Sequence, residues 1–274
     1  MTRDIPSPER LPSPSFQGPK NTPGGKDRLA ALRRRVGRIE QGFRPQGTRA
    51  VPLGVQEIDA RLPAGGLLPG ALYEIAPAAP RDAGAATAFC ATLAARFLKE
   101  SDGALLWCLN PAVADAGEIY PPALARFGIA PDRLVALCAR DDATVLQAIE
   151  DALASGAPAA IVGEARDVSL TASRRLQLAA GKSGVTPILL RPYGAEQTSS
   201  AALMRWRVES APSRPRGWAA MLDEPGFPCW QANLFRSRGG APGNWTMEWR
   251  DETGDLALAA PLRDRQAETA ASTA

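Results

Sequence analysis

Short apolar runs and amphipathic stretches alternate through the middle of the chain. Nearly continuous apolar runs are typical of central parallel strands, whereas apolar residues that recur every three or four positions indicate helices. The segment 52–75 leads into a first strand, and further strands are predicted at 105–109, 134–138, 159–162 and 187–190. Helices are predicted at 84–99, 114–127 (broken or bent at Pro121-Pro122), 143–155 and 172–180. This alternation predicts βαβ units and a mostly parallel sheet.

The pattern changes after Ala201, where apolar and polar residues alternate with a period of two. Met204, Trp206 and Val208 alternate with arginines and a glutamate, and Trp245, Met247 and Trp249 lie in a second alternating run. The segment Trp230–Arg236 and a Gly239-Gly240 turn lie between them. Such alternation predicts antiparallel strands that extend the same sheet, with the tryptophans of the two runs pointing into the core.

The two ends of the chain differ from this α/β domain, which we place at residues 50–260. Residues 1–25 contain six prolines and predict a disordered leader, and residues 261–274 predict a disordered tail. Residues 26–49 predict a basic helix and a linker. The helix carries a narrow apolar stripe of partner-binding candidates: Leu29, Leu32, Val36 and Ile39.

Charge is spread unevenly along the 274 residues, although the formal net charge is only +3. Residues 26–49 hold eight Lys or Arg against two acids, residues 51–199 hold twelve against sixteen, and residues 200–250 hold seven against four. The flanking basic segments suit nucleic acid or an acidic partner. The candidate nucleic-acid contacts are Arg33, Arg34, Arg35, Arg38, Arg205, Arg207, Arg236 and Arg238. The alternative is that these arginines only occupy a solvated face.

Several classes of site are excluded by residue content. The chain has no histidine, and its four cysteines form no C-x-x-C pair, which argues against zinc sites, histidine acid–base catalysis and Ser-His-Asp triads. No run of about 18 apolar residues is present, so we expect no membrane insertion and a cytoplasmic location. We expect no cofactor and no metal.

The order strand, loop, helix at residues 73–99 is where nucleotide-hydrolysing folds place G-x-x-x-x-G-K-[ST]. Here the four defining positions are Ala79, Gly84, Ala85 and Ala86, so the lysine and the magnesium-binding hydroxyl are both missing. One strand-end acid is present, Glu164. Loss of the lysine and the hydroxyl removes several kcal/mol of charge stabilisation, to order of magnitude, and predicts a protein that does not hydrolyse ATP. Backbone amides at the helix start leave weak nucleotide binding open.

A second match to part of this motif is misleading. Gly181-Lys182-Ser183 spells its last three letters, but a helix precedes the triplet and a strand follows it. A helix C-terminus carries partial negative charge and repels phosphate. We interpret the triplet as a helix-ending turn.

Several segments resemble known proteins. Residues 53–59 (Leu-Gly-Val-x-x-Ile-Asp) and 65–75 (Gly-Gly-Leu-Leu-Pro-Gly-Ala-Leu-Tyr-Glu-Ile) are similar to the start of the ATP-binding core of RecA recombinases. Residues 172–185, Ile188-Leu-Leu-Arg-Pro, residues 238–245 and Glu248-Trp resemble the RecA-related ImuA family of bacterial mutagenesis proteins. The resemblance covers roughly residues 26–250, and it implies a RecA-like core.

The resemblance implies a non-catalytic accessory factor in damage-induced (SOS) translesion synthesis, nucleoid-associated when DNA is damaged. The implied partners are an ImuB-type inactive polymerase-like protein and an error-prone replicative-type polymerase, with RecA and weak single-stranded DNA contact as further expectations. Two alternatives stay open. One is a DNA-stimulated ATPase of the RecA type, and the other is a damage-induced cell-division inhibitor.

Overall fold

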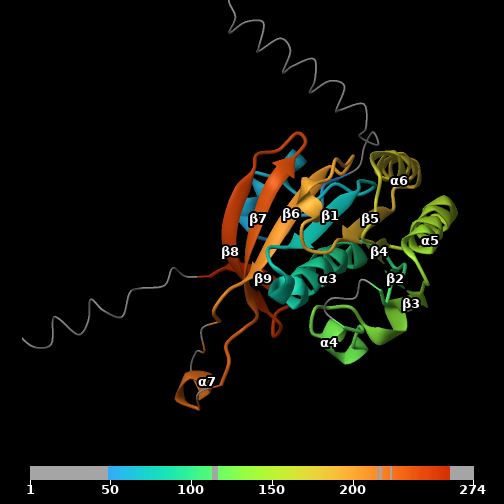
Figure 1. Cartoon of the computed structure of the whole chain (residues 1–274). Coiled ribbons are helices and arrows are strands. Elements are labelled where there is room, and N and C mark those ends of the chain that lie inside the picture. The colour runs from blue at the N-terminus through green and yellow to red at the C-terminus, as the bar shows by residue number, and fades with distance from the viewer. Residues whose placement is uncertain (1–48, 113–116, 214, 216–217, 223, 260–274) are drawn as a thin grey trace, which may run out of the picture. The chain divides into compact units, whose positions relative to one another are not determined.

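The computed structural model describes residues 49–112, 117–213, 215, 218–222 and 224–259, and within them nine strands form one sheet (Figure 1). The strands are β1 (Tyr73–Pro77), β2 (Leu105–Leu109), β3 (Leu134–Cys138), β4 (Ala160–Glu164), β5 (Thr186–Leu190), β6 (Met204–Ser210), β7 (Cys229–Ser237), β8 (Gly243–Arg250) and β9 (Asp255–Leu258). Their order across the sheet is β3-β2-β4-β5-β1-β6-β7-β8-β9.

Pairing in this sheet changes direction at one strand. The pairs from β3 to β6 are parallel, and the pairs from β6 to β9 are antiparallel. Strand β6 is therefore parallel to β1 on one side and antiparallel to β7 on the other. The sheet confirms the predicted α/β class, with a mostly parallel centre, flanking helices and an antiparallel C-terminal extension.

Helices lie on both faces of the sheet (Figure 1). The longer ones are α3 (Ala83–Lys99), α5 (Asp142–Ser155) and α6 (Leu170–Ser183), and the short ones are α2 (Gln56–Asp59), α4 (Pro121–Ala125) and α7 (Trp218–Met221). Four 3₁₀ turns accompany them in the described residues: η1 (Pro63–Gly65), η2 (Pro80–Asp82), η3 (Pro131–Arg133) and η4 (Ala195–Gln197). Helix α3 packs on one face, and α5 and α6 pack on the other.

Local sequence signals explain where α5 and α6 begin and end. The side chains of Asp141 and Ser169 each accept a hydrogen bond from the backbone N–H three residues later, at 2.8 and 3.1 Å. These bonds satisfy amides that have no partner inside the helix. Gly156 and Gly184 follow the last turns with φ of 67° and 79°, the left-handed conformation that favours glycine. Lys182 and Ser183 thus lie in the last turn of α6.

Alternate residues of each parallel strand divide the core in two. On β2, Trp107 packs with the α3 side and Cys108 with the α5 and α6 side. In the antiparallel extension, Trp206, Trp230 and Trp249 are buried on the α3 side, and the Phe89 ring of α3 lies edge-on to Trp206 at 5.2 Å between centroids. The alternation therefore predicted the inward position of Trp206 and Trp249, while Trp245 is only partly buried.

The predicted helix 114–127 is confirmed over Pro121–Ala125 and wrong for the described residues before it. Residues 117–120 are not helical, and the helix begins at Pro121 instead of bending there. Proline lacks the N–H that a helix interior needs, but the first helical positions have no use for that donor. Strand β9 was not predicted from the sequence.

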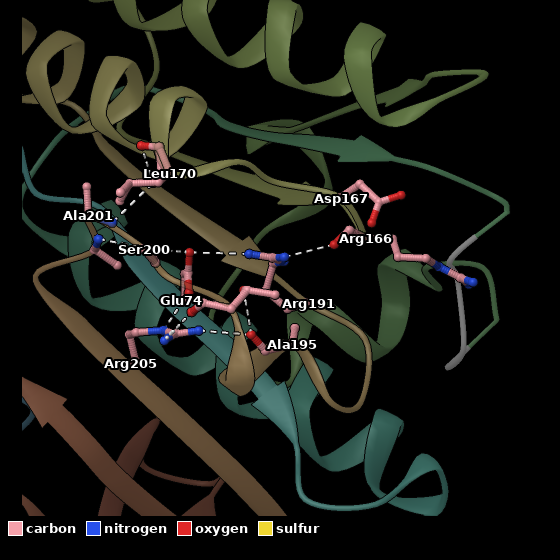
Figure 2. Close-up of polar contacts among 12 residues, drawn as sticks. Glu74, Arg166, Asp167, Leu170, Arg191, Ala195, Ser200, Ala201 and Arg205 are labelled. Atoms are coloured by element: carbon pink, nitrogen blue, oxygen red, sulfur yellow. Dashed lines mark hydrogen bonds and ion pairs between the residues drawn. The ribbon is translucent and has the colours of Figure 1, made fainter.

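A buried carboxylate joins β1, the loop after β5, and β6 (Figure 2). Glu74 Oε1 accepts hydrogen bonds from the Arg191 guanidinium at 3.3 Å and the Ser200 hydroxyl at 2.6 Å. Glu74 Oε2 accepts from Arg205 Nε at 2.7 Å. Arg205 also donates to the carbonyls of Thr198 and Ala195, both at 3.0 Å. The ion pairs therefore fix the loop 191–203 against the sheet.

A second carboxylate holds the neighbouring strand ends. Asp142, the first residue of α5, accepts from the Asn110 side chain at 2.7 Å and from the backbone amides of Arg166 and Asp167 at 3.1 and 2.7 Å. The Arg166 carbonyl accepts in turn from Arg191 at 2.8 Å (Figure 2). The loops that follow β2, β4 and β5 are thus connected by hydrogen bonds.

We expect Glu74→Gln to lower the free energy of unfolding by about 3–5 kcal/mol, because it leaves two buried guanidinium groups without a counter-charge. The matched control is Glu150→Gln, which removes an ion pair to the exposed Arg175 and is expected to cost less than about 1 kcal/mol. Urea denaturation of both variants measures the difference. Equal losses for the two variants would contradict the structural role of Glu74.

Candidate functional site

A pocket of about 240 Å³ opens at the carboxyl ends of β1, β4 and β5, beside the first turns of α3. Its other wall is formed by residues 117–127, which include α4. In open α/β sheets this edge is the usual position of ligands. We call it the strand-end pocket.

The structure brings together three of the five residues predicted for the former nucleotide site. Gly84, Ala86 and Glu164 line the strand-end pocket. Ala79 precedes the turn η2, and Ala85 is partly buried against the core. Nothing lies within 4 Å of a Cβ built on Gly84, and its φ is not positive, so this position does not require glycine.

The loop before α3 is closed by local hydrogen bonds. The Asp82 amide donates to the Ala79 carbonyl at 2.9 Å, and the Ala83 amide donates to the Pro80 carbonyl. These amides are therefore not available to a phosphate, whereas a phosphate-binding loop depends on free amides. Arg81 is exposed and reaches Glu209 across 3.8 Å.

Asp82 adds negative charge in the loop just before α3. It is 1% exposed, and its Oδ1 accepts from the Ser210 amide at 3.1 Å, while Oδ2 has no hydrogen bond to any described residue. A carboxylate at the start of α3 uses the positive end of the helix dipole and repels other anions. Asp82 was not among the predicted site residues, although an acid inside a degenerate phosphate loop is a signal that the sequence contains.

Glu164 is the polar group at the base of the pocket. It is 5% exposed, and its Oε1 accepts from the Trp107 indole N–H at 2.9 Å. Its Oε2 makes no hydrogen bond within the described part of the chain. Burial raises the pKa of the Glu164 carboxyl above its usual value, and the Trp107 hydrogen bond and the Asn110 backbone offset part of this rise. Cys90 and Cys108 are the titratable neighbours, and burial raises the pKa of both thiols, with a smaller rise from the Glu164 charge.

A second, open groove of about 450 Å³ lies between α6, the loop at 199–201 and β7. We call it the basic groove. It is lined by Leu170, Arg174, Gln177, Leu178, Ser199, Ser200, Ala201, Arg236 and Arg238, and none of these described residues is acidic. Leu178 is 52% exposed, which is unusual for a large apolar residue. The period of α6 already places Arg174 and Leu178 away from the buried residues Ser173 and Leu176, so this signal was present in the sequence.

The candidate arginines have different surroundings. Arg236 and Arg238 line the basic groove, and Arg207 is exposed on β6. Arg205 is buried, held by Glu74, and lies over the Phe235 ring at 5.2 Å from its centroid. The remaining candidates lie outside the described residues: Leu29, Leu32, Arg33, Arg34, Arg35, Val36, Arg38 and Ile39.

Two other kinds of feature are absent from the described residues. No helix there is long and apolar enough to cross a membrane. In the same part of the chain, no group of three or more Cys, Asp or Glu side chains is arranged to hold a metal ion.

We expect Glu164→Gln to stabilise the protein at neutral pH, with an advantage that disappears in acid. The pKa of Glu164 is raised on folding, so its contribution to the free energy of unfolding is fully present below the unfolded pKa, about 4.3 for Glu. That contribution is lost as the pH rises through the folded pKa. Glutamine stays neutral and can still accept from Trp107. Urea midpoints of both proteins between about pH 4 and pH 7 measure this. A constant difference across that range would contradict burial of an ionisable Glu164.

Comparison with known proteins identifies the family of the chain. No protein-family model matches it. Two curated proteins, each named Protein ImuA and coming from two strains of Caulobacter vibrioides (NA1000 / CB15N and ATCC 19089 / CB 15), are each 38% identical over 221 residues. The match covers 77% of this chain and 87% of each relative. Identity of this extent shows common descent, and the chain belongs to the ImuA family.

Proposed function

We propose that this protein is a non-catalytic accessory factor in damage-induced, error-prone translesion DNA synthesis, where it docks a mutagenic polymerase assembly. The observation that carries the proposal is the chemistry at the start of α3. The lysine and hydroxyl positions are Ala85 and Ala86, the loop amides of Asp82 and Ala83 are used locally, and Asp82 is a buried carboxylate. A site of this kind lacks the lysine and the hydroxyl that hold ATP and magnesium, and the Asp82 carboxylate repels their phosphates.

Membership of the ImuA family supports the biological context. The partners we propose are an ImuB-type inactive polymerase-like protein and an error-prone replicative-type polymerase, with RecA as a further partner. The protein would act in the cytoplasm, and on the nucleoid when DNA is damaged.

We further propose that single-stranded DNA contacts the basic groove. Arg174 of α6, Arg236 of β7 and Arg238, which follows β7, line one open surface that is free of acids among its described residues. Phosphates attract such a surface, and the exposed Leu178 side chain offers an apolar surface to a base. Arg205 is excluded from this surface by its burial with Glu74.

The absence of catalysis is tested on the purified full-length chain. We expect no binding of ATP–Mg²⁺ by calorimetry and no phosphate release with single-stranded DNA, and the double variant Ala85→Lys, Ala86→Thr should be equally inactive because Asp82 and the closed loop remain. Phosphate release by the unmodified chain would establish the DNA-stimulated ATPase instead.

In cells, deletion of the protein should lower the frequency of damage-induced mutation. Filamentation on overexpression with an unchanged mutation frequency would favour a division inhibitor.

The DNA contact is tested by the salt dependence of binding to an oligothymidylate. Removing one arginine that binds a phosphate should reduce the slope of log K against log salt by about 0.7, so changing Arg174, Arg236 and Arg238 to Gln should reduce it by about 2. The matched control is Arg175→Gln, on the same helix but paired with Glu150 outside the groove. An unchanged slope in the triple variant would place any DNA contact elsewhere on the chain.

A further inference from the structure

Strand β3 is an edge of the sheet that carries none of the usual protection against pairing with another strand. It lies at one end of the strand order, and no described strand pairs with it on the side away from β2 (Figure 1). Edge strands are normally protected by a charge, a proline or a bulge, whereas β3 reads Leu-Val-Ala-Leu-Cys. The opposite edge, β9, begins with the charged residue Asp255. Of the two edges, β3 is therefore the one suited to pairing.

The side chains of β3 are also open to solvent. Val135 is 53% exposed, and Ala136 and Cys138 are exposed as well. Leu134 and Leu137 are partly buried, each against one of the two halves of the core. An apolar strand with this much exposed surface is typical of a contact with another polypeptide.

The pairing with β2 determines which backbone groups of β3 face the open edge. The Ala139 N–H donates to the Leu109 carbonyl of β2 at 2.8 Å. Backbone groups of successive residues in a strand point to opposite sides, so those of Leu134, Ala136 and Cys138 point away from β2. The Leu134 N–H is already used in the turn η3. The groups that face the edge for a new strand are the Leu134 carbonyl, both groups of Ala136 and the Cys138 N–H.

These groups match a second copy of the same strand, paired antiparallel about a twofold axis at Ala136. The two Ala136 residues exchange both of their hydrogen bonds, and the Cys138 N–H of each copy donates to the Leu134 carbonyl of the other. All five residues of each β3 are then paired. On the face toward α5, Val135 of one copy lies opposite Leu137 of the other, which covers the exposed Val135 side chain.

Charges at the two ends of β3 favour this register. Asp132 and Arg140 are exposed and flank the strand on either side. In the twofold arrangement, Asp132 of each copy lies at the same end as Arg140 of the other, so opposite charges meet at both ends. Asp141 is already engaged as the cap of α5, where it accepts from Thr144. A shift of the axis by one residue in either direction removes the match of Asp132 with Arg140 and leaves one end of each strand unpaired.

We propose that the β3 edge is the interface of a symmetric homodimer, in which two sheets join through antiparallel β3 strands. Most soluble homo-oligomers have such a twofold axis, with the same surface used by both copies. The proposal goes beyond the proposed function and does not depend on it. The basic groove adjoins α6 and β7 rather than β3, so each copy keeps its own groove open.

The dimer is tested by sedimentation equilibrium of the full chain, with Ala136→Pro as the disrupting variant. Proline is tolerated on an edge strand where its missing N–H would face outward, so the circular dichroism spectrum should be unchanged. Loss of the two hydrogen bonds at the axis should weaken association at least about tenfold. Ala136→Ser keeps the N–H and is the matched control. A single-chain mass at every concentration up to the solubility limit, or a dimer unaffected by Ala136→Pro, would overturn the proposal.

The register is tested by crosslinking. Ala136→Cys, combined with Cys138→Ser, places two thiols across the axis, where Cα atoms of a hydrogen-bonded pair lie about 5.5 Å apart, within disulfide range. We expect a covalent dimer on mild oxidation. The unmodified chain is the control, because its two Cys138 residues would be offset by about 13 Å along the strands. A Cys138–Cys138 bridge in the unmodified chain, or no bridge from Ala136→Cys, would contradict this register.

A charge exchange tests the interface without altering β3 itself. Asp132→Arg should weaken the dimer about three- to tenfold, because arginines then meet at both ends of the paired strands. Adding Arg140→Asp restores opposite charges and should recover the association. Failure of the double variant to recover would contradict the proposed pairing. A photo-crosslinking residue at Val135 that captures another protein in cells, with no crosslink between copies of this chain, would assign the edge to that partner and overturn the homodimer.

Discussion

The ion pairs of Glu74 are the interaction on which the centre of the sheet depends. One buried carboxylate holds Arg191 and Arg205, and thereby fixes the loop after β5 and the first residues of β6. Strand β6 is also the strand where the sheet changes from parallel to antiparallel pairing. Removal of one partner from a buried charge cluster leaves an uncompensated charge, so Glu74, Arg191 and Arg205 depend on one another.

Much of the fold was readable from the hydrophobic pattern. Strands β2 and β3 match the predicted residues 105–109 and 134–138, and α3 and α5 begin one residue before their predictions. Helices α3 and α5 carry long amphipathic patterns, and β2 and β3 are continuous apolar runs. The prolines at 121–122 misled the prediction because a proline that starts a helix and one that bends it look alike in sequence. Strand β9 is four residues long, too short for its alternation to be distinctive.

The candidate site was only partly readable. The loss of the lysine and hydroxyl was evident from Ala85 and Ala86, but the burial of Asp82 and the free oxygen of Glu164 depend on neighbours distant in sequence. Arg205 shows most clearly what the sequence pattern does not predict. The alternation places Arg205 on the sheet face opposite Trp206, but the loop at 195–200 covers that face and buries the side chain. Period-two patterns identify faces, whereas only the tertiary structure determines whether a face meets water.

The carboxylate oxygen Glu74 Oε1 is shared by two residues that belong to different surfaces. Arg191 lines the strand-end pocket, Ser200 lines the basic groove, and both donate to that one atom. If filling the pocket displaces Arg191, the hydrogen bond of Ser200 must readjust. Thermodynamic linkage then requires two equal effects: a ligand in the groove changes the affinity of the pocket by the same factor by which a ligand in the pocket changes the affinity of the groove. The two surfaces would thus be coupled without any domain movement.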